Sequence, residues 1–454
     1  MAKYQKYAEY KDSGVEWLGE IPSHWNLYSL KRSVDKCTNG FWGNEPDGRN
    51  DLCVLRVADF NRDNFTINED KLTLRSVLPK EAESRLIKKG DLLIEKSGGG
   101  EKTLVGCVVQ FDKDFPAITS NFVAKMTPNV ITDSKYLTYA FAHLYSGRVN
   151  FPSIKQTTGI QNLDSEAYLM EKFGFPSKNE QIQIANFLDH ETTKIDHLIE
   201  KQQQLIELLK EKRQAVISHA VTKGLDSNVP MKDSGVEWLG EVPEHWKIIK
   251  GGYIGTLFGS ESIQEDDVTD QGSLPFIKVS SLSAETFKLS NIDWFVSERR
   301  AKFCKAEKNY IVFPKRGAAI FTNKVNVIEV DSVIDPNLMG WKIGKQGITE
   351  YFALLLKTRG LDDIADVSTV PQINNKHIAP EKFPLPALSE QCEIVKFVGM
   401  ELTKFDEMIL KAESAIQLMQ ERRTALISAA VTGKIDVRNW QAPTDAEAQT
   451  ELSA

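Results

Sequence analysis

The chain has 454 residues, of which 41% are hydrophobic and 26% are charged, and its formal net charge is −7. These fractions are ordinary for a soluble globular protein, and the length predicts roughly two to four domains. The acidic balance argues against a general polyanion binder, which would usually be basic, although a local basic surface remains possible. No segment approaches the about 18 continuous apolar residues of a membrane span.

The N-terminus and the cysteines indicate a cytoplasmic protein. The first residues, MAKYQKYAEYKDSG, contain no apolar core and no small-residue cleavage site, so we expect no signal peptide. The five cysteines are widely spaced and form no C-x-x-C pair. This spacing favours neither a zinc site nor a disulfide framework, and it fits a reducing compartment.

Two segments of the chain occur twice, in the same order. Residues 11–25 (KDSGVEWLGEIPSHW) return as residues 232–246 (KDSGVEWLGEVPEHW), and residues 173–226 return in looser form as residues 383–436. The sequence between the members of each pair hardly matches. A period above 200 residues indicates a duplicated domain pair and not a short-period solenoid. By analogy with closed homodimers, it also predicts an internal two-fold pseudosymmetry.

Each variable segment has the composition of an α+β domain. Runs rich in Val, Ile and Phe, bounded by Gly, Asp and Pro, are typical of strands. A short helix is predicted at Ser134–Leu144. Strands are predicted at Leu52–Phe60, Gly90–Ile94, Leu104–Phe111, Leu274–Val279, Tyr310–Phe313 and Val325–Val330.

Residues 180–223 and 390–432 are predicted to form two long helices. Their apolar residues alternate between spacings of three and four, and a helix of this length measures about 65 Å. Two such helices most simply pack on each other, although each could instead cap only its own domain. The candidate contact residues are Leu188, Ile195, Leu198, Leu205, Leu209, Phe397, Phe405, Ile409, Ile416 and Met419.

The sequence carries no complete catalytic, nucleotide-binding or metal motif. Asp335–Asn337 is the nearest approach to an amino-methyltransferase loop, and it lacks the second proline and the aromatic residue. Ser97–Thr103 (SGGGEKT) departs from the Walker spacing because Glu101 interrupts it, so a Gly-rich loop close to a backbone is the better interpretation. His24 and His245 lie beside tryptophans of the repeat, where packing or capping roles are expected.

The two copies of SGVEWLGE(I/V)P-x-HW, the two variable segments and the two FP-x₃-EQ…A-x-x-S-x-A-V-T helices together resemble the specificity subunit of a Type I restriction–modification enzyme. The resemblance covers nearly the whole chain. It implies an α+β fold, in which two target-recognition domains with β-rich sheets are joined by two long constant helices. These helices would form an antiparallel coiled coil with internal pseudo-two-fold symmetry.

The resemblance also implies a non-catalytic, cytoplasmic DNA-binding subunit. Each recognition domain would read one half of a bipartite, asymmetric site in double-stranded DNA. The long helices would set the spacing and dock two methyltransferase subunits, and motor–nuclease subunits would join for restriction. This chain would bind no cofactor. S-adenosylmethionine, together with ATP and Mg²⁺ for restriction, would lie on the partner subunits.

The expected domain order follows from the repeats. The chain divides into an N-terminal repeat, a first recognition domain, a central constant region, a second recognition domain, a C-terminal helix and a tail expected to be disordered. The expected boundaries are 1–25, 26–175, 176–246, 247–385, 386–436 and 437–454.

Polar side chains on loops at corresponding places in the two variable segments are the candidates for DNA contact. Arg and Lys suit guanine, and Asn and Gln suit adenine, whereas phosphate contacts only position the protein. The first segment contributes Lys96, Ser97, Lys155, Gln156, Thr157 and Gln161. The second contributes Lys315, Arg316, Thr369, Gln372 and Asn374.

Alternatives remain open for these residues and for the whole chain. Arg56 and Lys278 precede Val57 and Val279, and each fits a strand-face charge as well as a phosphate contact. Any single candidate could be an ordinary solvated side chain. A coiled-coil scaffold without DNA contact would explain the acidic charge, but it would not explain why the variable segments diverge while the frame stays fixed.

Overall fold

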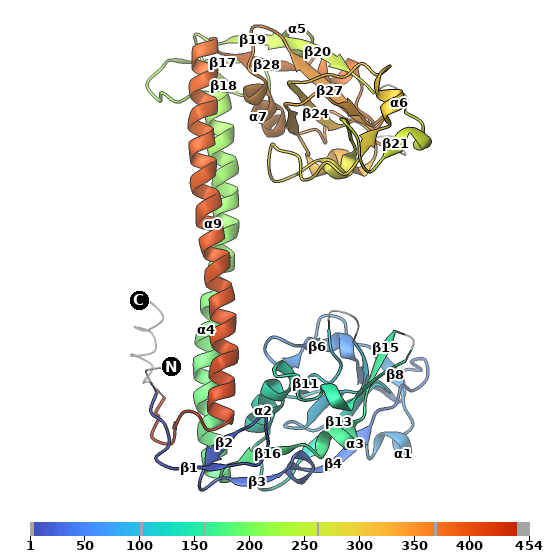
Figure 1. The fold of residues 1–454 in the computed structure, drawn as a ribbon, viewed down its shortest axis with the longest axis vertical. Coiled ribbons are helices and arrows are strands. Elements are labelled where there is room, and N and C mark those ends of the chain that lie inside the picture. Colours follow the sequence, from blue (N-terminus) through green and yellow to red (C-terminus); the bar gives the residue numbers. More distant parts are fainter. Residues whose placement is uncertain (1–3, 100–102, 158, 261–262, 367–369, 443–454) are drawn as a thin grey trace. The chain divides into compact units, whose positions relative to one another are not determined.

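The computed structural model describes residues 4–99, 103–157, 159–260, 263–366 and 370–442 (Figure 1). It divides into two compact units. Unit 1 comprises Met1–Gln202 and Ser414–Ala454, and unit 2 comprises Gln203–Glu413. The boundary cuts both long helices, so each unit contains one part of α4 (Lys178–Lys223) and one part of α9 (Leu388–Val431).

Unit 1 is built on a four-stranded antiparallel sheet of order β11-β9-β13-β4 and a three-stranded mixed sheet of order β12-β5-β8. A further sheet, of order β10-β15-β14, lies beside them. The strands are β1 (Tyr10–Asp12), β2 (Glu20–Pro22), β3 (Asn26–Ser29), β4 (Val34–Asn39), β5 (Asp51–Leu55), β6 (Phe60–Asn61), β7 (Thr66–Ile67), β8 (Leu74–Ser76), β9 (Leu92–Glu95), β10 (Ser97–Gly98), β11 (Val108–Gln110), β12 (Ala117–Thr119), β13 (Val123–Pro128), β14 (Ile154–Thr157), β15 (Ile160–Leu163) and β16 (Lys172–Phe175). The shorter helices are α1 (Pro79–Ala82), α2 (Ser134–Ser146) and α3 (Ser165–Leu169).

Unit 2 repeats this plan with different lengths. Its four-stranded sheet has the order β20-β27-β24-β25, and a second sheet has the order β21-β23-β22-β26, in which β22 and β26 run parallel. The strands are β17 (Met231–Asp233), β18 (Glu241–Pro243), β19 (Lys247–Lys250), β20 (Gly255–Phe258), β21 (Val268–Thr269), β22 (Leu274–Ile277), β23 (Phe295–Val296), β24 (Tyr310–Pro314), β25 (Asn326–Ile328), β26 (Val333–Ile334), β27 (Leu338–Ile343) and β28 (Lys382–Leu385). The shorter helices are α5 (Gly251–Ile254), α6 (Glu298–Ala301), α7 (Thr349–Arg359) and α8 (Asn375–Ile378).

The main core of each unit joins its sheet to the long helices. In unit 1, α2 packs between the four-stranded sheet and α4, and the same cluster contains Phe187 and Leu188 of α4 and Leu426 and Val431 of α9. In unit 2, α7 takes the place of α2 in a second cluster. The prediction of an α+β fold with long helices is therefore confirmed.

Most predicted strands are present but shorter than expected. The run Leu52–Phe60 is interrupted at Val57–Asp59, because Asp59 accepts a hydrogen bond from the Arg56 backbone and closes a 3₁₀ turn. Only Val108–Gln110 of the run Leu104–Phe111 is a strand, since Gly106 has a φ of 106°. The helix predicted from Ser134 is α2, and the Asp133 side chain caps its first turn.

The long helices pair antiparallel within each unit. In unit 1, Asp196 of α4 and Arg423 of α9 form an ion pair at 3.0 Å, while Gln183 contacts Trp440 beyond the end of α9. In unit 2, Arg213 pairs with Asp406 at 3.5 Å. The predicted contact residues divide into three groups: Leu188, Ile195, Leu209 and Phe405 are buried, Phe397, Ile409, Ile416 and Met419 are half-buried, and Leu198 and Leu205 are 40% and 42% exposed.

The tail begins with packed residues. Val437 is only 1% exposed, and the Trp440 ring lies edge-on to Phe187 at 5.5 Å between centroids. The expectation of disorder is therefore wrong for this stretch, which closes the core of unit 1. Residues 443–454, the remainder of the predicted tail, lie outside the described residues.

Candidate nucleic-acid interface

A buried carboxylate at the start of α4 fixes the first repeat to the helix. Glu180 accepts hydrogen bonds from Tyr7 Oη at 2.8 Å and Trp25 Nε1 at 3.0 Å, and it pairs with His24 Nε2 at 2.9 Å. Burial and the hydrogen bond to Glu180 raise the pKa of Tyr7 well above its usual value, so the hydroxyl stays a donor. The position of Glu180 in the first turn of α4 also favours its negative charge, because the positive end of the helix dipole lies there.

The second repeat uses the same arrangement at the start of α9. Glu390 accepts a hydrogen bond from Trp246 Nε1 at 2.9 Å and pairs with His245 Nε2 at 3.1 Å. In both repeats the histidine therefore contacts the first turn of a long helix, as expected for a packing or capping role. The duplicated motif is explained by this duplicated junction.

A glutamine next to each carboxylate attaches the variable segment to the first turn of the same long helix. Gln181 Oε1 accepts from the Asp133 backbone N–H at 2.8 Å, and Gln391 Oε1 accepts from the Ile348 N–H at 2.9 Å. Each acceptor holds the first turn of α2 or α7. Both glutamines are fully buried, so every polar atom of the amide needs such a partner.

The first candidate surface lies on the small sheet β10-β15-β14, whose strand β15 is labelled in Figure 1. Ser97 stands opposite Asn162, which stands in turn opposite Lys155, and Gln156 is opposite Gln161. The two stretches that the sequence singled out, about 60 residues apart, are therefore brought together in one sheet. We call this sheet, with Lys96 beside it, the first reading sheet.

Side chains of the first reading sheet hold one another in place. Lys96 Nζ donates to Asn39 Oδ1 at 2.7 Å, Ser97 Oγ donates to Asn162, and Lys155 pairs with Asp164 at 3.0 Å. Sequence reasoning missed Asn39 and Asn162. Asn162 directly follows the candidate Gln161, so its neighbourhood was a signal, whereas Asn39 is linked to the sheet only through the hydrogen bond from Lys96. Both carry an amide suited to adenine.

Gln161 does not belong among the exposed candidates. Its side chain is 6% exposed, and its Oε1 accepts a hydrogen bond from the Val105 N–H at 3.0 Å. Gln156 on the neighbouring strand is exposed, whereas only the backbone of Thr157 is described. Gln161 thus holds the Val105 backbone beneath the sheet, and its contact with a base stays a prediction.

The glycine loop beside this sheet approaches a backbone closely, as expected. Gly99 has a φ of +67°, and a Cβ at this position would lie 2.7 Å from the Thr103 carbonyl oxygen and 2.8 Å from Gln161 Oε1. Any side chain here would therefore push the loop away from the sheet. Residues 100–102 lie outside the described residues.

The second candidate surface lies at the corresponding place in unit 2. Lys315 and Arg316 follow β24, and Arg316 forms an isolated β-bridge with Gln372. The Ile373 N–H donates to the Lys315 carbonyl at 2.9 Å. Asn374 caps α8, where its N–H donates to His377 Nδ1 at 2.9 Å. These segments form the second reading surface.

Two predicted residues, Arg56 and Lys278, are held by contacts within their own unit. Arg56 donates to Asp59 Oδ1 at 2.8 Å, which raises the pKa of the guanidinium, and Lys278 Nζ lies 3.8 Å from the centre of the Trp294 ring. Both therefore have partners within their own unit, and a phosphate contact stays a prediction. Thr369 lies outside the described residues.

Comparison with known proteins identifies the class. A model of the Type I restriction modification DNA specificity domain matches residues 57–208 and 243–418, well over half of the chain. Each match covers one variable segment and part of a long helix. The chain therefore belongs to the Type I restriction–modification DNA specificity family. It is a DNA-recognition subunit whose two copies of the domain correspond to two recognition halves.

Individual relatives agree along most of their length. The chain is 21% identical over 333 residues to the Type I restriction enzyme MjaVIII specificity subunit of Methanocaldococcus jannaschii, covering 71% of this chain and 75% of the relative. It is 21% identical over 373 residues to the Type I restriction enzyme EcoKI specificity subunit of Escherichia coli K12, covering 79% and 78%. These relatives are named for specificity, a recognition role.

Solved structures share the fold. A chain solved in work on complex assembly and conformational transition of the type I R-M system matches with a TM-score of 0.66 at 14% identity, covering 90% of this chain and 98% of that one. The HsdS subunit from Thermoanaerobacter tengcongensis matches with a TM-score of 0.54 at 13% identity, covering 91% and 98%. Within the described ranges, no helix is long and apolar enough to cross a membrane.

Proposed function

We propose that unit 1 and unit 2 each read one half of a bipartite, asymmetric site in double-stranded DNA. One observation carries this proposal: two equivalent polar surfaces, with different side chains, are mounted on frames that repeat the same hydrogen bonds. Lys96 and Ser97 in the first reading sheet correspond to Lys315 and Arg316 in the second reading surface. A scaffold without DNA contact would not need two such surfaces.

The difference between the two surfaces supports an asymmetric target. Arg316 offers a guanidinium that can pair with the two acceptors of a guanine, whereas Ser97 and Asn162 offer a hydroxyl and an amide. Lys155 and Lys315 suit phosphate oxygens, which fix position without specifying sequence. The two half-sites are therefore expected to differ.

The long helices are proposed to dock two methyltransferase subunits per chain and to set the gap between the half-sites. Leu205 and Leu208 of α4 and Met408 of α9 remain 42%, 61% and 42% exposed in unit 2. Apolar side chains that project from a helix pair in this way are typical of a subunit interface. Motor–nuclease subunits join the complex for restriction.

This chain is proposed to contribute recognition and no chemistry, in the cytoplasm. Methyl transfer requires S-adenosylmethionine, and DNA translocation and cleavage require ATP and Mg²⁺. We assign these cofactors to the partner subunits, because the sequence carries none of the motifs that would hold them here.

Exchange of one variable segment tests the proposal. Residues 26–172 are replaced by the corresponding segment of another specificity subunit, the chimera is expressed with the methyltransferase partner, and the methylated motif is read by single-molecule sequencing. One half of the motif should change and the other should persist. Exchange of residues 247–382 is the matched control and should change the opposite half. A change in both halves, or in neither, contradicts independent reading.

A further inference from the structure

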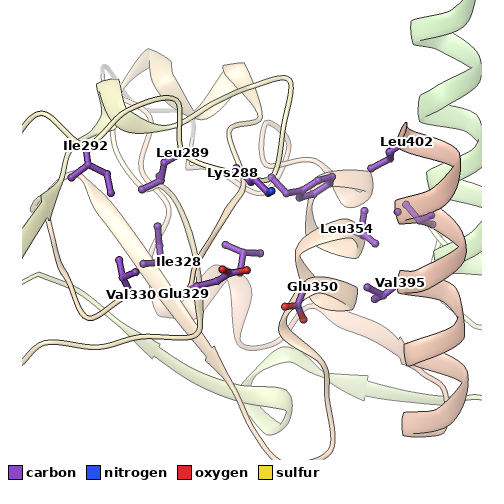
Figure 2. Close-up of a pocket in the computed structure, with 14 residues that line it drawn as sticks. Lys288, Leu289, Ile292, Ile328, Glu329, Val330, Glu350, Leu354, Val395 and Leu402 are labelled. Carbon is purple, nitrogen blue, oxygen red and sulfur yellow. The ribbon is translucent and has the colours of Figure 1, made fainter. Parts of the chain in front are cut away.

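Unit 2 contains a cavity of about 420 Å³ beside α9 (Figure 2). Its walls come from the segment after β22, from β25, from α7 and from one face of α9. The volume falls in the range of about 300–1,000 Å³ typical of ligand pockets. The lining is largely apolar and includes Phe287, Leu289, Val327, Leu354, Val398 and Leu402.

Three charged side chains line the same cavity. Figure 2 shows the carboxylates of Glu329, which follows β25, and Glu350, which lies on α7, both directed into the space between sheet and helices. Lys288 contributes one positive charge, so the lining is acidic by one unit. Within the described ranges, neither carboxylate forms a hydrogen bond or an ion pair. A cation next to an apolar group would therefore complement this lining.

At the corresponding place in unit 1, polar contacts join the short helix α2 to the long helix α4. The hydroxyls of Tyr136 and Tyr351 each donate to a carbonyl near the end of a long helix. This shared contact shows that α2 and α7 are corresponding helices of the two units. In unit 1, Lys135 pairs with Asp189 of α4, and Tyr139 Oη donates to Asp189 at 2.9 Å. This ion pair and hydrogen bond join α2 directly to α4.

The residues that make these contacts in unit 1 correspond to residues that line the cavity in unit 2. Through the repeats, Lys135 corresponds to Glu350, Tyr139 to Leu354, Asp189 to Gly399 and Thr192 to Leu402. The ion pair is lost, one charge is reversed and two polar groups become apolar. The two copies of one junction therefore differ in sign and in polarity.

Gly399 keeps the cavity accessible from the helix. It lies inside α9, where glycine costs about 1 kcal/mol relative to alanine. No atom lies within 4 Å of the position that its Cβ would take. A side chain would be accommodated and would favour the helix, so neither packing nor turn geometry explains a glycine here. The open space beside this glycine would admit an approaching ligand.

We propose that this cavity docks a segment of a partner protein that inserts a bulky apolar side chain and carries a lysine or arginine beside it. The apolar walls take the side chain, and Glu329 and Glu350 take the cation. Such a mode is related to helix-in-groove recognition, in which an apolar anchor enters a groove and flanking charges add specificity. Because an ion pair and a hydrogen bond occupy the corresponding place in unit 1, the partner would engage unit 2. The proposal does not depend on DNA reading.

Two short peptides test the docking chemistry. N-acetyl-Phe-Lys-amide and N-acetyl-Phe-Glu-amide are titrated against the full-length protein without DNA, and binding is followed by saturation-transfer NMR. The lysine peptide should bind saturably in the millimolar range, as expected for so small a ligand. The glutamate peptide should bind at least about fivefold more weakly, since it repels the acidic lining.

Variants locate the binding and keep the result interpretable. Gly399→Leu fills the cavity and should abolish binding of the lysine peptide, while its circular dichroism and melting temperature show that it folds. Met400→Leu is the matched control, since Met400 is exposed, adjacent and outside the cavity lining, and it should bind as the wild type does. Glu350→Lys should reverse the preference between the peptides. Equal binding of both peptides, or unchanged binding to Gly399→Leu, overturns the proposal.

Discussion

The two units share a frame and differ in what the frame presents. Glu180 and Glu390 bind the tryptophan of their repeat at 3.0 and 2.9 Å. Gln181 and Gln391 make matching bonds to the variable segments. The reading surfaces, by contrast, share little beyond their place in the fold. Sequence is therefore repeated at these junction contacts, and it diverges at the reading surfaces.

The two frames are nevertheless unequal in strength. The Glu180 side chain is 7% exposed and has three partners, whereas that of Glu390 is 24% exposed and has two. Tyr7, the additional donor in unit 1, corresponds to Asn228 in unit 2, and Asn228 is exposed. Unit 1 thus depends more on its buried carboxylate than unit 2 does.

The largest effect is expected from changing the register of α4. A two-residue insertion near Gln202–Leu205 rotates the following apolar stripe by roughly half a turn and should abolish folding or assembly. A duplication of four residues there restores the stripe and adds about 6 Å. This second variant should stay active and lengthen the gap in the methylated motif by one or two base pairs, since B-DNA rises about 3.4 Å per pair. An active four-residue variant with the original gap would show that the helix docks partners without acting as a spacer.

Removal of the Glu180 and Glu390 carboxylates should show that the two junctions differ in strength. Glu180→Ala leaves Tyr7 and Trp25 without their acceptor in a buried site and should cost about 3 kcal/mol in the free energy of unfolding. Glu390→Ala should cost less, about 1–2 kcal/mol, because solvent reaches that site. Thermal unfolding measures both, and Glu180→Gln, which keeps an acceptor, should be milder than Glu180→Ala. Equal losses at the two sites would mean that the junctions are energetically equivalent.

Exposed leucines on α4 separate docking from folding. Leu205→Asp with Leu208→Asp places two charges where a partner subunit is proposed, and it should weaken binding of the methyltransferase at least about tenfold. The chain itself should still fold, because these side chains are 42% and 61% exposed. Leu209→Asp is the contrasting variant: Leu209 is buried, so this change should lower the melting temperature. Unaltered assembly of the double variant would remove these leucines from the interface.

A smaller and more local effect is expected at the reading surfaces. Arg316→Ala should weaken binding to the specific site by about 1–3 kcal/mol and relax only the second half of the motif. Ser97→Ala is the counterpart in unit 1 and should affect only the first half. Gln161→Ala should instead lower stability without changing either half, since Gln161 holds the Val105 backbone. Competition binding with half-site variants of the DNA distinguishes these outcomes.

The smallest effect is the dependence on pH that Lys357 contributes in unit 2. Burial, together with the nearby Arg213, lowers the pKa of Lys357 to about 8, whereas the corresponding residue of α2 is Ala142. Below about pH 8 the Lys357 side chain is charged in the folded protein, and burial of this charge lowers the free energy of unfolding by its full amount. Between about pH 8 and the usual lysine range, near pH 10.4, the unfolded chain binds more protons, so stability rises with pH. The melting temperature of Lys357→Met minus that of the wild type should therefore fall as pH rises from 7 to 10. A constant difference would show that Lys357 is solvated.

Patterns in the sequence predicted the elements with strong periodicity and missed those fixed by distant partners. The long helices follow from apolar spacing, and the paired reading segments follow from the duplicated frame. Gln161 looked like an exposed amide, because only the fold brings the Val105 N–H to it. Trp440 looked like part of a polar tail, because its partner Phe187 lies far away in the sequence. The cavity needs both a variable segment and a constant helix, so neither stretch alone reveals it.

The last residues of the long-helix region also determine when unit 1 can be completed. Its core includes Leu426, Val431, Ile435 and Val437, which the ribosome makes after every residue of unit 2. Domains usually fold as they emerge, beginning at the N-terminus. Unit 1 is begun first, but Phe187 and Leu188 of its core stay uncovered until the last part of α9 has been synthesised. A chain stopped at Glu413 would contain all of unit 2 and an open unit 1, so premature termination should lead to aggregation and not to a half-functional subunit.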